Sequence, residues 1–236
     1  MRSSRGTYDY LPGTLNEINY ISHVIKSAKL ELRSGVEGSE DSFIALSEAS
    51  PSIIHLATHG FFYEPEDIED KLSEDPTKYS FLNIQNLEEV SAETQAMRGS
   101  GILFSGANHA LKGISIPANI PDGILTAEEL SNLNLQQTEF VVLSACETGL
   151  GTTTEEGVWG LQRGFKLAGV KSLLMSLWKV DDKVTSKMMQ YFYENISNGL
   201  NKIHALQEAQ KKMRDNPETS QPYFWAGWIL LDGLDY

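Results

Sequence analysis

Short apolar runs alternate along this chain with longer segments in which apolar residues recur at helical spacing. The runs have the length of buried strands, and they predict strands at residues 52–60, 101–106, 138–146, 170–178 and 223–233. The helical patterns predict helices at residues 18–28, 40–49, 155–169, 182–199 and 201–214. Strands that alternate with helices are typical of an α/β fold, in which a mainly parallel sheet carries helices on both faces.

The first helix has a start signal and is followed by a candidate short strand. Thr14 and Glu17 have the spacing of a capping box, in which two side chains bond the free N–H groups of a helix start. We therefore expect the helix to begin at this pair. "KLELRSG" at residues 29–35 is the candidate strand.

Residues 61–100 depart from the alternation. Seven of the twelve residues at 64–75 are acidic, and this stretch has no clear period. We interpret the region as a mobile surface insertion, with a solvated acidic loop that has no specific task as the alternative. The chain shows no internal repeat, so we expect one compact domain at 11–236 after a lead or linker at 1–10.

The amino-acid composition narrows the class of protein. Hydrophobic residues make up 41% of the chain, as in a packed globular protein. The formal net charge of −13 argues against direct binding of a nucleic acid, whose phosphates need a basic surface. No segment has the apolar core of a signal peptide or the length of a membrane helix, and one cysteine forms no internal disulfide. We therefore expect a cytoplasmic protein without membrane contact.

Two reactive side chains stand at the ends of predicted strands. Cys146, the only cysteine, closes the third apolar run, and His59 lies near the end of the first. The carboxyl ends of parallel strands line the ligand crevice in such folds, so a thiol nucleophile and an imidazole base would face one site. A lone cysteine packed as a small hydrophobic residue is the alternative. His55 is expected to be a hydrogen-bonded core histidine, and the other histidines are expected at the surface.

The order of these residues along the chain excludes common enzyme classes. An α/β-hydrolase and a papain-like enzyme place the histidine after the nucleophile, whereas His59 comes 87 residues before Cys146. Histidine before cysteine is the order of caspases. The glycines at 149 and 151 lack the third glycine of a dinucleotide turn, and no phosphate-loop, H-E-x-x-H or C-x-x-C pattern occurs. We therefore expect no metal and no other cofactor.

Five segments carry a shared signature: "HLATHGFF" (55–62), "DGILTAEEL" (122–130), "VVLSACETGLG" (141–151), "EEGVWGLQRGFKLAGVKSLLMSLWKVDD" (155–182) and "PYFWAGWILL" (222–231). Together they resemble the CHAT family, caspase-like domains commonly joined to tetratricopeptide repeats. The resemblance implies the three-layer caspase–hemoglobinase fold and a His–Cys dyad, with His59 as base and Cys146 as nucleophile. It also implies that the backbone N–H groups of Gly60 and Cys146 stabilise the oxyanion.

Acidic residues after a later strand predict the substrate preference. Asp181 and Asp182 lie in "LWKVDD", which resembles a separase loop that holds an arginine at P1, the residue before the scissile bond. Two carboxylates there would bind Arg or Lys through charge-assisted hydrogen bonds. The alternative is that one of them caps the helix beginning near Lys183. Glu147 is a candidate for substrate contact or a loop anchor, and Trp178 is a candidate pocket wall.

The leading hypothesis is a cysteine endopeptidase that cleaves a protein or peptide, with a basic P1 residue as the expected preference. By resemblance, a tetratricopeptide-repeat sensor in the same chain or on another would control it, in bacterial signalling or defence. A caspase-like interaction module that no longer cuts is one alternative. A cysteine amidase or transferase is the other.

Overall fold

The larger of two sheets lies between layers of helices. The computed structural model describes residues 7–26, 29–76, 78–82, 91–117, 120–144 and 160–233. Within them, the larger sheet has the order β1-β5-β6-β7, and its strands are β1 (Ile53–Leu56), β5 (Phe140–Leu143), β6 (Leu173–Ser176) and β7 (Trp228–Leu231). The first three strands are parallel and β7 is antiparallel. The predicted mainly parallel sheet is thus confirmed.

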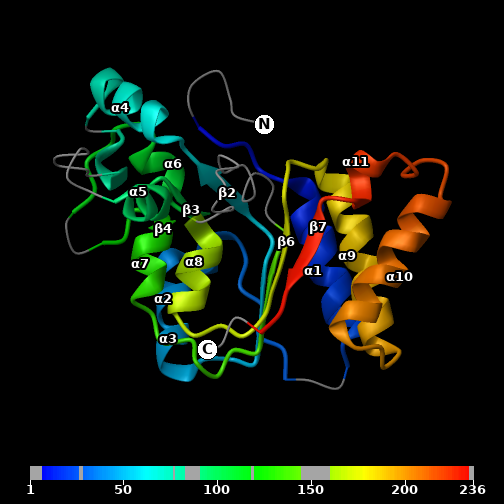
Figure 1. Cartoon of the computed structure of the whole chain (residues 1–236). Helices are drawn as coiled ribbons and strands as arrows, with labels where there is room; N and C mark the ends of the chain where they lie inside the picture. The colour runs from blue at the N-terminus through cyan, green and yellow to red at the C-terminus, as the bar shows by residue number, and fades with distance from the viewer. Residues whose placement is uncertain are drawn as a thin grey trace.

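Both faces of this sheet are covered, because alternate side chains of its strands feed two apolar clusters. Val141 and Leu143 of β5 belong to one cluster, and Phe140 and Val142 belong to the other. Figure 1 shows helices on either side of the sheet. On one side lie α1 (Pro12–Val24), α9 (Asp182–Ser197), α10 (Lys202–Asp215) and α11 (Pro222–Trp225). On the other side lie α2 (Glu40–Ile44), α3 (Leu46–Ala49), α7 (Ala127–Ser131) and α8 (Gly160–Leu167).

A second, antiparallel sheet stands beside the first. Its order is β2-β3-β4, with β2 (His59–Phe62), β3 (Ser100–Leu103) and β4 (Ile124–Thr126). The sequence predicted one strand at 52–60, and this is wrong: β1 ends at Leu56 and β2 begins at His59. The chain leaves one sheet for the other at Ala57 and Thr58, where the Thr58 hydroxyl donates to the Leu103 carbonyl at 2.5 Å.

The acidic region is more regular than the sequence suggested. It contains α4 (Pro65–Glu74), the 3-10 helix η2 (Ser80–Leu82) and α5 (Ala92–Arg98). Ile68, Tyr79 and Leu82 are at most 1% exposed and join an apolar cluster around β2 and β3. Ile68 and Leu72 are four residues apart on α4, and two apolar residues among acids are too few to reveal a helical period. The mobility expected for this region stays a prediction.

Element boundaries differ from the sequence predictions at both ends of the chain. The first helix begins at Pro12, a residue suited to the first helical position, and the Thr14 hydroxyl donates to Leu11 without forming a capping box. Residues 29–34 form no strand, and η1 (Gly35–Glu37) follows them. At the other end, a helical turn, α11, precedes β7.

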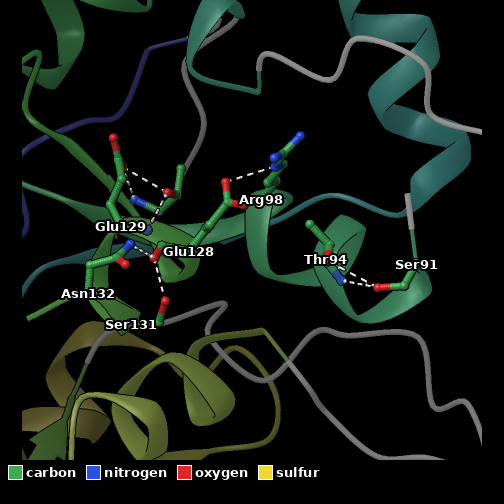
Figure 2. A network of polar contacts seen from close by, with 8 residues as sticks. Ser91, Thr94, Arg98, Glu128, Glu129, Ser131 and Asn132 are labelled. Carbon is green, nitrogen blue, oxygen red and sulfur yellow. Dashed lines mark hydrogen bonds and ion pairs between the residues drawn. The ribbon is translucent and has the colours of Figure 1, made fainter. Parts of the chain in front are cut away.

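A capping box does occur at the start of α7, within "DGILTAEEL". The Thr126 hydroxyl accepts from the Glu129 N–H at 3.2 Å, and the Glu129 carboxylate accepts from the Thr126 N–H at 2.9 Å. Figure 2 shows Arg98 of α5 turned towards Glu128, with Nε 2.8 Å from Oε2. Ser131 and Asn132 bond the Glu128 carbonyl in the same view. This segment therefore ties α7 to α5.

Glu40 links α2 to the start of β4. Glu40 is only 6% exposed, and its Oε2 accepts a hydrogen bond from the Gly123 N–H at 2.8 Å. Burial raises the pKa of the Glu40 carboxyl from 4.5 to about 7, the bond from Gly123 opposes this, and the nearby carboxylates of Asp122 and Glu129 add to the rise. Folded Glu40 therefore binds a proton more tightly than unfolded Glu40.

This difference predicts a pH-dependent stability. The contribution of Glu40 to the free energy of unfolding is fully present below pH 4.5 and is lost as the pH rises through about 7. We expect Glu40→Gln, which keeps an acceptor for Gly123, to flatten the fall in Tm between about pH 5 and about pH 8. Thermal unfolding followed by circular dichroism measures this. Glu31→Gln, at an exposed surface pair, is the control, and equal pH slopes in Glu40→Gln and wild type would contradict the assignment.

Candidate functional site

The carboxyl ends of β1 and β5 meet at one edge of the larger sheet. The strands run in parallel with Leu56 opposite Leu143, and the Ser144 N–H donates to the Leu56 carbonyl at 3.0 Å. His59 follows Leu56 by three residues, and Cys146 follows Ser144 by two. Cys146 and the neighbouring Glu147 lie outside the described residues. The two strand ends from which the predicted dyad would extend are thus side by side.

His59 is held by the segment that precedes α1. Its Nε2 lies 2.6 Å from the Asp9 carbonyl oxygen, and the Tyr8 ring packs on the imidazole with 4.9 Å between ring centroids. A carbonyl oxygen accepts only, so Nε2 carries the hydrogen in this contact. In the neutral ring, Nδ1 is then the basic nitrogen. The sequence did not point to Asp9, because a backbone carbonyl has no signature in a residue pattern, and Tyr8 falls in residues 1–10, which were expected to be a lead or linker.

The segment is in turn bonded to α6 (Ala107–Ala110). The Tyr8 N–H donates to Asn108 Oδ1 at 2.9 Å, and Asn108 Nδ2 donates to the Tyr8 carbonyl at 2.9 Å. Both polar groups of the Tyr8 backbone are therefore held by one side chain. The sequence assigned no role to Asn108.

Gly60 is the second residue of β2 and is buried opposite Ile102 of β3. It is adjacent to His59, as its expected part in an oxyanion site requires. Its role there, like that of the Cys146 N–H, stays a prediction.

Asp181 and Asp182 both make backbone contacts at helix starts. Asp181 is the N-cap of α9, and its Oδ1 accepts from the Lys183 N–H at 3.0 Å. The alternative that one acid caps this helix is thus confirmed for Asp181. Asp182 Oδ2 accepts the Gly13 N–H of α1 at 2.5 Å, and a Cβ at Gly13 would lie 2.5 Å from the same oxygen. Contact of either acid with a substrate stays a prediction.

Trp178 packs against the segment before β7. Its Nε1–H donates to the Tyr223 carbonyl at 2.7 Å, and the two rings stack with 6.2 Å between centroids. A Cβ at Gly227 would lie 2.6 Å from Trp178 Cε2, so a glycine is needed there for this approach. Trp178 is half-buried beside the exposed Tyr223, and its expected role as a pocket wall stays a prediction.

His55 is a hydrogen-bonded core histidine, as predicted. Its Nδ1 lies 2.9 Å from the Tyr193 hydroxyl of α9, and its Nε2 lies 2.6 Å from Glu17 Oε1 of α1. Burial, with a smaller effect of the Glu17 carboxylate, raises the pKa of Tyr193, so the phenol stays protonated and available as a donor. The group fixes α1 and α9 to β1. His23, His109 and His204 are exposed, as expected.

Within the ranges given above, no group of three or more His, Cys, Asp or Glu side chains is placed to bind a metal ion. Burial raises the pKa of Asp122, whose carboxylate accepts the Ile124 N–H at the start of β4. None of the helices in the described part of the chain has the length and apolar character needed to cross a membrane.

Comparison with known proteins identifies relatives. A model of the CHAT domain matches residues 1–233, a span that includes residues 1–10. The human protein named Tetratricopeptide repeat protein 28 is 34% identical over 108 residues, which is 46% of this chain and 4% of that protein. The chain thus corresponds to a small part of this long relative. Since the family match extends over almost the whole length, the α/β layers and paired strand ends described above are those of a caspase-like, peptidase-related module, and this chain belongs to the CHAT domain family.

Proposed function

We propose that this chain is a cysteine endopeptidase that cleaves a protein substrate with His59 and Cys146. The observation that carries the proposal is the setting of His59. It follows the end of β1, which is paired with β5, by three residues, and the Asp9 carbonyl holds Nε2, which leaves Nδ1 as the basic nitrogen of the neutral ring. An imidazole fixed in this way is suited to accept and return a proton at Nδ1.

Chain connectivity supports the pairing with Cys146. Two peptide units separate Cys146 from Ser144, and they span at most about 7.6 Å between Cα atoms. The Ser144 N–H is bonded to the Leu56 carbonyl at the end of the neighbouring strand β1. His59 lies three residues after Leu56. The connectivity therefore allows the thiol and the imidazole to meet, because only a few residues separate each of them from the paired strand ends.

The proposed reaction has two stages. The Cys146 thiolate attacks the scissile carbonyl carbon, the C–N bond breaks, and the imidazolium of His59 gives its proton to the leaving amine. Water then attacks the thioester with the imidazole as base, which releases the acid product and restores the thiol. The N–H groups of Gly60 and Cys146 would stabilise the oxyanion in both stages.

We also propose that the substrate has a basic residue at P1 and that a partner controls the peptidase activity. Asp181 and Asp182 supply two carboxylates after β6, at the same end of the sheet as the ends of β1 and β5. Charge-assisted hydrogen bonds from an arginine or lysine would complement them. The relative named for its tetratricopeptide repeats supports a sensor of that kind.

The dyad predicts the loss of activity in two variants. We expect wild type to cleave members of a fluorogenic peptide library, Cys146→Ala to be inactive, and His59→Ala to lose about 100-fold or more in kcat/KM because its proton transfer is missing. His204→Ala, which removes an exposed histidine on α10, is the control and should keep wild-type activity. Cleavage by Cys146→Ala would overturn the proposal. If the wild type cleaves no peptide, also with tetratricopeptide-repeat protein added, the non-cleaving interaction module is favoured.

The acidic pair predicts a substrate-dependent effect. Asp181→Asn keeps a good N-cap for α9, and Asp182→Asn keeps an acceptor for the Gly13 N–H, so each removes charge with little change in structure. We expect about a tenfold or larger loss in kcat/KM for Arg at P1, from the weaker charge-assisted bond. Peptides with an uncharged P1 residue are the matched controls. Equal losses on all peptides, or none, would remove the pair from the P1 site.

A further inference from the structure

We propose that Asn108 is a positioning residue for His59, which it controls through the backbone of Tyr8 and Asp9; the catalytic part of this inference rests on the function proposed above. Asn108 need not touch the substrate. Its side chain holds the segment whose carbonyl and ring contact the imidazole.

The contact between the segment and His59 has two parts with different effects. The Asp9 carbonyl bonds Nε2 at 2.6 Å and so selects the tautomer that carries hydrogen on Nε2. The Tyr8 ring lies against the imidazole at 4.9 Å with a tilt of 55°, which restricts rotation of the histidine ring. Both parts depend on the path of a backbone that belongs to no helix.

Asn108 fixes that path by bonding both polar groups of the Tyr8 backbone. An amide side chain that donates to a residue's carbonyl and accepts from its N–H imitates one rung of a β-ladder. The Tyr8 carbonyl belongs to the peptide that joins Tyr8 to Asp9. Holding it sets the orientation of that peptide, and with it the start of the residue whose carbonyl bonds His59.

Helix α6, which carries Asn108, packs against the β2-β3-β4 sheet, which carries His59. Ala107 and Leu111 are buried in the apolar cluster around β2 and β3. Gly123 has φ +83°, and a Cβ there would lie 2.4 Å from the Ala107 nitrogen, so α6 sits tightly on the entry to β4. Asn108 is thus presented from a packed support and not from a free loop.

Beyond Asp9, the segment leads into a second fixed point. Gly13, at the start of α1, donates its N–H to Asp182 of α9. The carbonyl that bonds His59 therefore lies between two anchors, Asn108 before it and Asp182 after it. Since the bonding atom is in the backbone, substitution of the Asp9 side chain leaves it in place, whereas Asn108 offers a side chain through which the contact can be weakened.

The experiment compares Asn108→Ala and Asn108→Asp with the wild-type chain. Ala removes both bonds, and the nearly isosteric Asp keeps the acceptor for the Tyr8 N–H but loses the donor to the Tyr8 carbonyl. His109→Ala is the matched control, because His109 is exposed on the same helix. Circular dichroism establishes whether each variant is folded. If Asn108→Ala does not fold, Asn108→Asp alone provides the test.

Two readouts are measured on each folded variant. Imidazole ¹⁵N shifts, assigned with His59→Gln, report the tautomer of His59, and peptide cleavage gives kcat and KM separately. We expect both Asn108 variants to lose the single Nε2–H tautomer and to lose about tenfold or more in kcat, with KM within about twofold of wild type. His109→Ala should change neither readout.

The outcomes separate this inference from the proposed function. An unchanged tautomer in a folded Asn108 variant overturns the positioning role, and so does an unchanged kcat. If the wild type cleaves no peptide, also with tetratricopeptide-repeat protein added, the proposed function fails, while the ¹⁵N shifts still decide whether Asn108 positions the His59 ring. A shifted tautomer with a lower kcat supports the inference.

Discussion

The parallel register of β1 and β5 is the constraint on which the candidate site depends. Leu56 lies opposite Leu143, and the Ser144 N–H continues the ladder by one more bond to Leu56. Parallel strands end at the same edge of a sheet, so this pairing brings together two chain segments far apart in the sequence. Burial on both faces fixes the register, since a slip by one residue would exchange the side chains of the two apolar clusters. The sheet thus acts as the frame of the site, and His59 lies at the first residue of the second sheet, three residues after Leu56.

The layered architecture could be predicted from the sequence because its central strands are short, mainly apolar runs. All four residues of β5 and of β6 are buried, and near-continuous apolar runs are typical of parallel strands that are covered on both faces. The β2–β4 sheet was harder to predict, because β2 follows β1 after two residues and reads as its continuation. The helix start at Pro12 was missed for a different reason. The Thr14–Glu17 spacing has the form of a capping box, but Glu17 turns inward to His55, so a tertiary contact overrides the local pattern.

The candidate site was predictable only where side-chain chemistry marks it. His59 stands out as a histidine near a strand end, whereas its partner Asp9 contributes a backbone atom that any residue could supply. Two adjacent acids after β6 suit a cap and a cation site equally well, because an aspartate at a helix start satisfies both patterns. The structure separates the pair by their backbone partners, Lys183 for Asp181 and Gly13 for Asp182. No motif around Asn108 in the sequence indicates its role, because its partner Tyr8 lies 100 residues earlier.

The bond between Gly13 and Asp182 joins residues 169 positions apart. Contacts of such long range form late, because the chain between them must first be brought to order. During synthesis the segment that holds His59 is made well before α9, the helix that receives α1. The histidine therefore gains its final surroundings only after α9 has been made. A growing or truncated chain that lacks α9 has the residues of the dyad but not the bond that anchors α1.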